Sequence, residues 1–469
     1  MRLSPRALFC AVVLVSAAPV RAADEDVTTK LPAKCEECQI AGAGRYLVMK
    51  LKGVRGLTVY DAATQKLSTI ELSDDEFLYA AGGDAAFVYL KESNELQTWR
   101  LSTGKMVKAK GFADKPNVQA LLMGHSRGDL ALLRMGRNPA TGTFGSDSLV
   151  DTTEIKLATT KYQAPGGAVA GRNWDQAQLR ANGDMSRLVE WMPGTGAALT
   201  TAAVLSRTDT GYQIASTYNM PNSLIPGDDG RVYTPFGNTV ESNPDYNPNF
   251  GGIPFKMSPA IKGKALVPAI GGQFVLGVTR EGGLTLYAVR STDAIAPLGD
   301  FPGWDPVKPD VRPGASFIGP DNTAIRPEDL GPGAVGEGKN PLTLDRRLCF
   351  APAQDHIVFL PYSNDKVVQR KFDLKATLDA GGEDYLMVVS VPALRGKAGT
   401  AWDYQLKTVA KNGPVKYDLP KAPEGMTVSA DGKITWTPPK GIIGRAPVEV
   451  RGTDAKGKIV RQTFEVTFD

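Results

Sequence analysis

Histidine and cysteine are scarce in this sequence. Among 469 residues there are two histidines, His125 and His356, and four cysteines. A zinc site built on the cysteines would need a fourth ligand, for which only these two histidines are available. With so few histidines a Ser-His-Asp triad has little support, and we interpret His125, within Gly124-His125-Ser126-Arg127-Gly128, as a loop residue. The sequence therefore indicates no catalytic residue, no metal and no cofactor.

An excess of charge of one sign is also missing. Three of the 54 lysines and arginines lie in residues 1–22, which leaves 51 basic residues against 50 acidic ones in the rest of the chain. Because the basic and acidic residues are almost equal in number, the net charge gives no support for nucleic acid as a partner.

Long apolar runs are absent as well. The run at residues 7–15 is too short to span a membrane, and no other run approaches the roughly 20 residues that a spanning helix needs. Residues 1–22 instead predict a secretory signal peptide, with arginines before the apolar run and the small residues Val20 and Ala22 before the cleavage site. We expect a mature chain that begins at Ala23, has no membrane-spanning segment, and is periplasmic, cell-surface or extracellular.

Glycine and proline are abundant. The 50 glycines and 33 prolines suit a turn-dense β protein better than a helical bundle, because both residues punctuate hairpins and break helices. An all-β fold is the prediction, and the length is typical of two or three domains.

A short apolar strand follows a Gly or Asp turn seven times along the chain. The spacings between the anchor residues of successive copies are 40, 44, 57, 43, 43 and 83 residues. Most of these spacings lie near the period of about 40 to 50 residues that is typical of propeller blades. The anchors are Val48, Val88, Leu132, Val189, Val232, Val275 and Val358.

A second strand with alternating apolar and polar residues follows in several copies, as in Leu57-Thr58-Val59-Tyr60. On this periodicity, residues 35–375 resemble the bacterial WD40-like or YVTN-like β-propellers, although the Gly-His and Trp-Asp dipeptides of true WD40 blades are not regularly present. The resemblance implies a propeller domain of about seven blades, which we assign to residues 23–380. A pair of β-sandwiches with the same spacing is the alternative.

The longest spacing contains a segment rich in glycine and proline, which we place at residues 297–341. It is either an inserted loop or it contains a degenerate eighth blade near Phe317. A second irregular stretch, residues 233–255, interleaves aromatic residues with asparagine and proline.

The pattern changes at Tyr385. Asp431-Gly432 has the composition of a tight hairpin turn, and Met426, Val428, Ile434 and Trp436 alternate on the two flanking strands. This stretch resembles the dystroglycan-type, cadherin-like Ig domains of bacterial surface proteins. The resemblance implies a β-sandwich over residues 385–469 with Trp436 in its core. Some cadherin-like domains bind calcium, but the acidic residues here are few, so we favour a solvated surface.

Three cysteines remain after signal cleavage: Cys35, Cys38 and Cys349. The Cys-x-x-Cys pair is followed by Gln39 where a c-type haem needs histidine, and no βαβ pattern surrounds it, so we expect a structural disulfide. Cys38 and Cys349 occupy equivalent positions in the first and last repeats. One hypothesis pairs Cys349 with Cys35 or Cys38 and closes the ring, whereas the other links Cys35 to Cys38 and leaves Cys349 free.

This architecture favours binding over catalysis. We predict a non-catalytic binding or scaffold protein of the cell envelope, with Tyr246, Phe250 and Trp304 as contacts for a protein or glycan partner. The Ig-like domain would act as an adhesive or spacer module, as its resemblance implies. The alternative is an exported polysaccharide hydrolase or lyase that uses paired acids such as Asp228-Asp229, which we interpret as solvated. A quinone-cofactor dehydrogenase ranks last, because the blades show no recurring tryptophan motif.

Overall fold

The computed structural model describes most of the chain from residue 26 onward. The described residues are 26–113, 116–136, 147–159, 178–191, 201–208, 211–219, 224–234, 237–242, 255–261, 263–289, 291–304, 317–318, 324–325, 342–382, 384–441 and 444–468. The predicted signal peptide, Tyr246 and Phe250 lie outside them.

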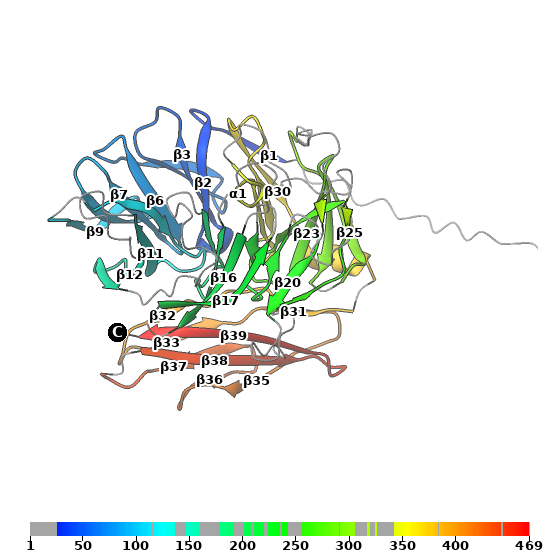
Figure 1. Ribbon diagram of the computed structural model, residues 1–469. Helices are drawn as coiled ribbons and strands as arrows, with labels where there is room; N and C mark the ends of the chain where they lie inside the picture. The colour runs from blue at the N-terminus through cyan, green and yellow to red at the C-terminus, as the bar shows by residue number, and fades with distance from the viewer. Residues whose placement is uncertain are drawn as a thin grey trace, which may run out of the picture.

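Seven four-stranded antiparallel sheets form the blades of a propeller (Figure 1). The first three blades are β2 (Cys35–Ala41), β3 (Tyr46–Leu51), β4 (Leu57–Asp61) and β5 (Lys66–Ile70); β6 (Phe77–Gly82), β7 (Ala85–Leu90), β8 (Glu95–Arg100) and β9 (Lys105–Gly111); and β10 (Val118–Leu122), β11 (Leu130–Met135), β12 (Asp147–Asp151) and β13 (Lys156–Thr159). The next three are β14 (Gln178–Ala181), β15 (Arg187–Trp191), β16 (Thr201–Thr208) and β17 (Gly211–Asn219); β18 (Ile225–Pro226), β19 (Val232–Tyr233), β20 (Thr239–Ser242) and β21 (Phe255–Met257); and β22 (Lys264–Pro268), β23 (Phe274–Thr279), β24 (Gly283–Ala288) and β25 (Ala294–Asp300).

The seventh blade combines both ends of the propeller. It consists of β28 (Leu348–Ala351), β29 (His356–Phe359) and β30 (Lys366–Lys371), and its outer strand is β1 (Val27–Lys30) from the start of the described chain. β1 pairs antiparallel with β30, with Val27 opposite Gln369. Backbone hydrogen bonds between the N-terminal strand and the last blade therefore close the ring.

The repeat prediction is confirmed strand by strand. All seven anchor residues lie in the second strand of a blade, from Val48 in β3 to Val358 in β29. Between blades six and seven the strands of the described residues are β26 (Phe317–Ile318) and β27 (Ala324–Ile325), which pair as a two-stranded sheet. β25 extends to Asp300, so the first residues of the segment that we placed at 297–341 belong to blade six.

Apolar side chains fill the spaces between neighbouring sheets. Clusters of buried residues lie between blades one and two, two and three, three and four, five and six, six and seven, and seven and one. Inner strands are buried on both faces for this reason, as in β7, where every residue is buried, whereas the outer strand β9 is exposed along its whole length.

The C-terminal part is a β-sandwich, as predicted. One sheet has the order β32 (Arg395–Gly396), β39 (Ile459–Phe468), β38 (Gly444–Thr453), β35 (Lys416–Lys421), and the other has β33 (Trp402–Gln405), β37 (Lys433–Trp436), β36 (Thr427–Val428). β31 (Leu386–Val388) pairs with β34 (Thr408–Ala410). Trp436 is buried against Phe468, with ring centroids 4.9 Å apart, and Gly432 has the positive φ of a tight turn. The core role of Trp436 is therefore confirmed.

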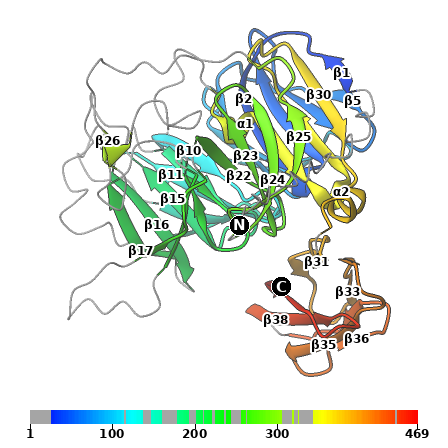
Figure 2. The ribbon, with the colours of Figure 1, turned by 90° about the vertical axis from the view of Figure 1, so that its right-hand side faces the viewer.

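Two short helices accompany these sheets. α1 (Leu344–Arg347) precedes β28, and α2 (Leu374–Ala380) leads from blade seven to β31, as Figure 2 shows. Asp373 caps α2 by accepting a hydrogen bond from the Ala376 amide at 2.8 Å. Within the described residues, no helix has the length and apolar character that crossing a membrane requires.

Candidate functional site

The first strands of all seven blades surround a central cavity of about 100 Å³. Each of these strands contributes wall residues, which are mostly aliphatic: Ile40, Ala81, Leu122, Ala181, Pro226, Val267 and Leu348. The cavity therefore lies on the axis of the ring.

The loops that join the first and second strands of the blades, here called the inner loops, interlock at one end of this cavity. The carbonyl oxygen of His125 in blade three accepts hydrogen bonds from Ala43 in blade one, at 3.0 Å, and Gly83 in blade two, at 3.1 Å. The Ser126 amide donates to the Gly183 carbonyl of blade four at 3.0 Å. These contacts tie blade three to its neighbours, blades two and four, and also to blade one.

Glycine makes this interlocking possible. A Cβ atom on Gly124 would lie 2.3 Å from the Gly183 carbonyl oxygen, and one on Gly183 would lie 2.5 Å from the His125 ring. Side chains at these positions would force the loops apart.

His125 and Asp228 form an ion pair between these loops. His125 Nε2 lies 3.2 Å from Asp228 Oδ1, and the amides of Gly183 and Gly271 donate to the same carboxylate at 2.7 and 2.9 Å. Burial lowers the pKa of His125, but Asp228 outweighs it and the net shift is upward. Burial likewise opposes ionisation of Asp228, but His125 and the two amides hold its pKa below the usual range. Our interpretation of Asp228-Asp229 as solvated acids is therefore wrong: each side chain is less than a fifth exposed, and Asp229 is paired with Arg231.

Ser126 extends this pair into a chain of polar groups. Its Oγ lies 3.0 Å from His125 Nδ1, and it is flanked by Gly124 and Gly128 in the Gly-x-Ser-x-Gly spacing of a hydrolase nucleophile elbow. A nucleophile elbow joins a strand to a helix, whereas this loop joins β10 to β11. Ser126 is also not among the residues that line the cavity. The geometry is that of a loop-bracing ion pair with a neighbouring hydroxyl.

A second charged group, here called the Arg–Asp cluster, lines the cavity away from the inner loops. It consists of Arg180 from β14 and Asp345 and Arg346 from α1. Arg180 Nε lies 2.7 Å from Asp345 Oδ2, and Thr343 Oγ1 donates to the other carboxylate oxygen at 2.5 Å. Burial raises the pKa of Asp345, but Arg180 and Arg346 outweigh this and shift it downward.

Both cavity carboxylates are thus held in the ionised form. A glycosidase general acid needs the opposite, a carboxyl group whose pKa is raised so that it keeps its proton. Asp228 and Asp345 already accept hydrogen bonds from fixed donors, so the described part of the cavity is arranged to hold charge in place rather than to donate a proton.

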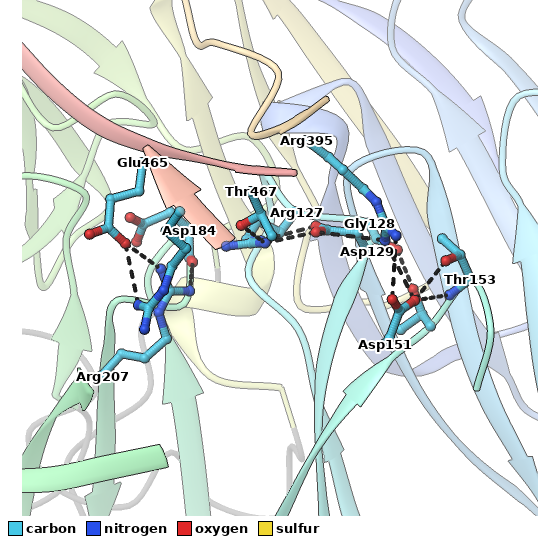
Figure 3. A network of polar contacts seen from close by, with 12 residues as sticks. Arg127, Gly128, Asp129, Asp151, Thr153, Asp184, Arg207, Arg395, Glu465 and Thr467 are labelled. Atoms are coloured by element: carbon cyan, nitrogen blue, oxygen red, sulfur yellow. Dashed lines mark hydrogen bonds and ion pairs between the residues drawn. The ribbon is translucent and has the colours of Figure 1, made fainter. Parts of the chain in front are cut away.

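The Ig-like domain contacts the face of the ring that carries the inner loops, here called the near face (Figure 3). Arg127, in the same inner loop as His125, donates to Thr467 Oγ1 at 3.1 Å. Arg207 at the end of β16 donates to Glu465 at 3.3 Å, and Arg395 donates to Asp151 at 3.3 Å. On the Ig-like side all three residues come from β32 and β39, so one edge of the sandwich makes these contacts with blades three and four.

The three cysteines share one apolar cluster at the junction of blades seven and one. The strand irregularity between Cys35 and Glu37 turns both Cys35 and Cys38 toward the buried side, although strict alternation would place them on opposite faces. The hydrogen bond with Cys38 and burial raise the pKa of Cys35, and burial raises that of Cys349. All three are free thiols in this structure, and both disulfide pairings stay predictions.

Trp304 packs against its own domain. Its ring lies 5.1 Å from those of Phe301 and Tyr362, and its Nε1 donates to the Arg280 carbonyl at 2.8 Å. Because strands alternate in direction, β20 ends and β21 begins on the near face, whereas β25 ends on the opposite face. Tyr246 and Phe250 lie outside the described residues, so a ligand role for these two residues and for Trp304 stays a prediction.

Sequence reasoning missed the Arg–Asp cluster and the partner of His125. No local pattern marks Arg180, Asp345 or Arg346. The inner loops do carry a signal, because a Gly-Asp pair recurs at 83–84, 128–129 and 183–184. Such a recurrence marks the loops that meet on the axis.

Comparison with known proteins supports the C-terminal assignment. Residues 386–469 match the family model described as "Putative Ig domain". No curated protein matches the chain in sequence.

Several solved structures are similar to this chain at low identity. The β-propeller domain of Cps50 (Swd1) from Myceliophteria thermophila is 11% identical, with a TM-score of 0.40, and the match covers 74% of this chain and 99% of that one. Hydrazine synthase of Kuenenia stuttgartiensis is 14% identical, with a TM-score of 0.37 and coverage of 74% and 97%. A chain of a mitotic checkpoint complex is 9% identical, with a TM-score of 0.41 and coverage of 80% and 99%. These values carry no functional argument, and the fold assignment rests on the seven sheets themselves.

Proposed function

We propose that this chain is an exported, non-catalytic binding or scaffold protein of the cell envelope. Its propeller would hold a protein or glycan partner, and its Ig-like domain would act as an adhesive or spacer module. The leader-like residues 1–22 support export, and the resemblance of the propeller to exported bacterial proteins supports an envelope location.

The observation that carries the binding role is the state of the cavity carboxylates. Asp228 and Asp345 are both fixed by cationic partners and both have lowered pKa values. Neither provides the protonated acid that a polysaccharide hydrolase needs.

The Ig-like domain supports the scaffold role. Arg127 and Arg207, whose side chains are 3% and 7% exposed, each donate to β39. Hydrogen bonds from buried arginines hold the two domains together at a defined contact. Such a contact suits an Ig-like spacer that holds the propeller at a distance from the cell surface.

The aromatic residues Tyr246 and Phe250 are the proposed partner contacts. Trp304 is a weaker candidate, because its ring and its Nε1 already have partners within the propeller. β20 ends and β21 begins on the near face, which is the face that the Ig-like domain contacts.

Capture from the cell-envelope fraction tests this proposal. The mature chain, residues 23–469, is immobilised and compared with a Tyr246→Ser/Phe250→Ser variant and with Lys433→Glu, a charge reversal on the exposed side of β37. We expect retention of a defined protein or glycan, its loss in the double variant, and its preservation in Lys433→Glu. No retained material, or equal retention by all three, would contradict the proposal.

A further inference from the structure

The Ig-like domain touches the near face of the ring at two places. The first, here called the polar contact, joins β32 and β39 to blades three and four (Figure 3). The second, here called the apolar contact, joins the start of the domain to blades six and seven. In the ring, blade five separates the two pairs of blades on one side, and blades one and two separate them on the other. The domain therefore extends across the near face from one side of the ring to the other.

Buried apolar side chains make the second contact. Tyr385 and Met387, from β31 and the residue before it, lie in one buried cluster with Phe274 of blade six and Phe350 of blade seven. The chain also enters the Ig-like domain here, through α2. Apolar side chains carry no charge for dissolved salt to screen. We expect the apolar contact to persist at high ionic strength for this reason.

The polar contact has the opposite chemistry. Arg207 lies 3.3 Å from Glu465, and Arg395 lies 3.3 Å from Asp151. The Glu465 side chain is 41% exposed and that of Asp151 is 36% exposed, so dissolved ions reach both carboxylates. Salt screens such pairs, because the Debye length falls from about 10 Å at 0.1 M to about 3 Å at 1 M. High ionic strength should therefore weaken the polar contact and leave the apolar contact in place.

The propeller groups at the polar contact keep a partner when the Ig-like domain leaves. Bonds across the contact are 3.1 Å or longer. Each of three propeller groups has a shorter bond within its own domain: Arg127 bonds Asp129 at 2.7 Å, Arg207 bonds the Asp184 carbonyl at 3.0 Å, and Asp151 accepts from the Thr153 hydroxyl at 2.6 Å. A buried charge left without a partner would be costly. Separation of the domains at this contact avoids that cost for these three groups.

We propose that the Ig-like domain is a lid that swings about the apolar contact and is latched, in a salt-dependent manner, at the polar contact. In the closed state it buries Arg127 and Arg207, whose side chains are 3% and 7% exposed. In the open state the inner loop of blade three and the ends of β12 and β16 are exposed to solvent. This inference concerns the arrangement of the two domains and does not depend on the identity of the envelope partner.

Fluorescence energy transfer between two labels measures the polar contact. The three cysteines of the mature chain, Cys35, Cys38 and Cys349, are at most 2% exposed, so introduced surface cysteines take up the labels selectively. Glu154→Cys on blade three and Lys397→Cys beside β32 are exposed positions on the two sides of the contact. We expect high transfer at about 0.1 M salt, a loss of transfer at about 1 M, and recovery on dilution. The open fraction should rise at least about fivefold, which is the combined effect expected of two partly exposed ion pairs.

A second pair of labels reports on the apolar contact. Thr292→Cys, in the turn before β25 of blade six, and Lys407→Cys, beside β34, are both exposed. Transfer between these labels should be the same at both salt concentrations, because the apolar contact stays closed. A loss of transfer here as well would show that the whole domain leaves the ring, and it would overturn the swinging lid.

Variants identify the latch. Arg395→Gln/Glu465→Gln should raise the open fraction at least about fivefold at about 0.1 M salt. Arg451→Gln, which removes an ion pair with Asp418 within the Ig-like domain, should behave as the wild type. If circular dichroism shows that the double variant is unfolded, Glu465→Gln alone takes its place.

Transfer at the polar contact that does not change with salt in the wild type would overturn the inference. Equal transfer in the latch variant and in Arg451→Gln would overturn it too. No envelope partner is present in these measurements, so their failure is distinguishable from failure of envelope capture.

Discussion

Gly82→Ala directly probes the packing of the inner loops. Gly82 ends β6, and a Cβ atom added there would lie 2.2 Å from the carbonyl oxygen of Gly124 and 2.3 Å from that of Arg127. Both obstacles are backbone atoms, so no side-chain rotation relieves the clash. Overpacking costs about 1–3 kcal/mol, and two fixed obstacles place this variant at the upper end, at about 3 kcal/mol of lost stability.

Gly111→Ala is the matched control in the same sheet. Gly111 ends β9, is exposed, and has no heavy atom within 4 Å of an added Cβ. Its replacement should be neutral or stabilise by about 0.4–1 kcal/mol, because alanine restricts the unfolded chain. Urea unfolding followed by tryptophan fluorescence measures both variants. A difference between them of less than about 0.5 kcal/mol, the scatter of ordinary surface substitutions, would refute backbone-to-backbone packing of the inner loops.

Three further predictions concern charged groups. His125→Gln should reduce the melting temperature at pH 5.5 and have little effect at pH 9. A raised histidine pKa contributes stability that is present below about pH 6.5 and is lost as the pH rises through the folded-state pKa. An equal loss at both pH values would contradict the ion pair with Asp228. Arg134→Met should destabilise the propeller by about 3–5 kcal/mol in urea unfolding, because it removes a buried guanidinium that lies 2.8 Å from each of Asp147 and Glu190, two carboxylates that are less than a tenth exposed. A loss below about 1 kcal/mol would speak against the buried triad. Thr467→Val should lower the free energy of unfolding by about 1.5 kcal/mol in a thermal experiment, because it removes a hydrogen-bond acceptor of the buried Arg127. Thr463 is exposed on the same strand, so Thr463→Val should be neutral. Equal effects of the two substitutions would argue against the domain contact.

The propeller was predictable because its signal is repeated. Each second strand is an apolar run bounded by a Gly or Asp turn, so Val48, Val232 and Val358 identify their blades even where the spacing between copies varies. The hairpin of the Ig-like domain was predictable for a local reason, since the turn at Gly432 and the alternation toward Trp436 lie within a few residues of each other.

The site was not predictable in the same way. His125 and Asp228 lie in different blades, and their meeting depends on the closure of the whole ring. Paired acids in a turn-rich segment are ordinarily solvated, so no local feature distinguishes Asp228 from a surface acid. Arg180 on β14 of blade four and Arg346 on α1, just before blade seven, likewise meet only in the folded ring. The loops between these elements vary in length, so no fixed sequence spacing predicts that the two residues lie close together.

We propose that this protein binds its envelope partner without converting it. The most direct measurement is the release of reducing ends from envelope polysaccharide incubated with the mature chain, alongside the amount of polysaccharide retained. We predict no reducing ends above the protein-free blank, and retention of polysaccharide if the partner is a glycan. Sugar release that rises with protein concentration would contradict the account and return attention to the carboxylates of the cavity.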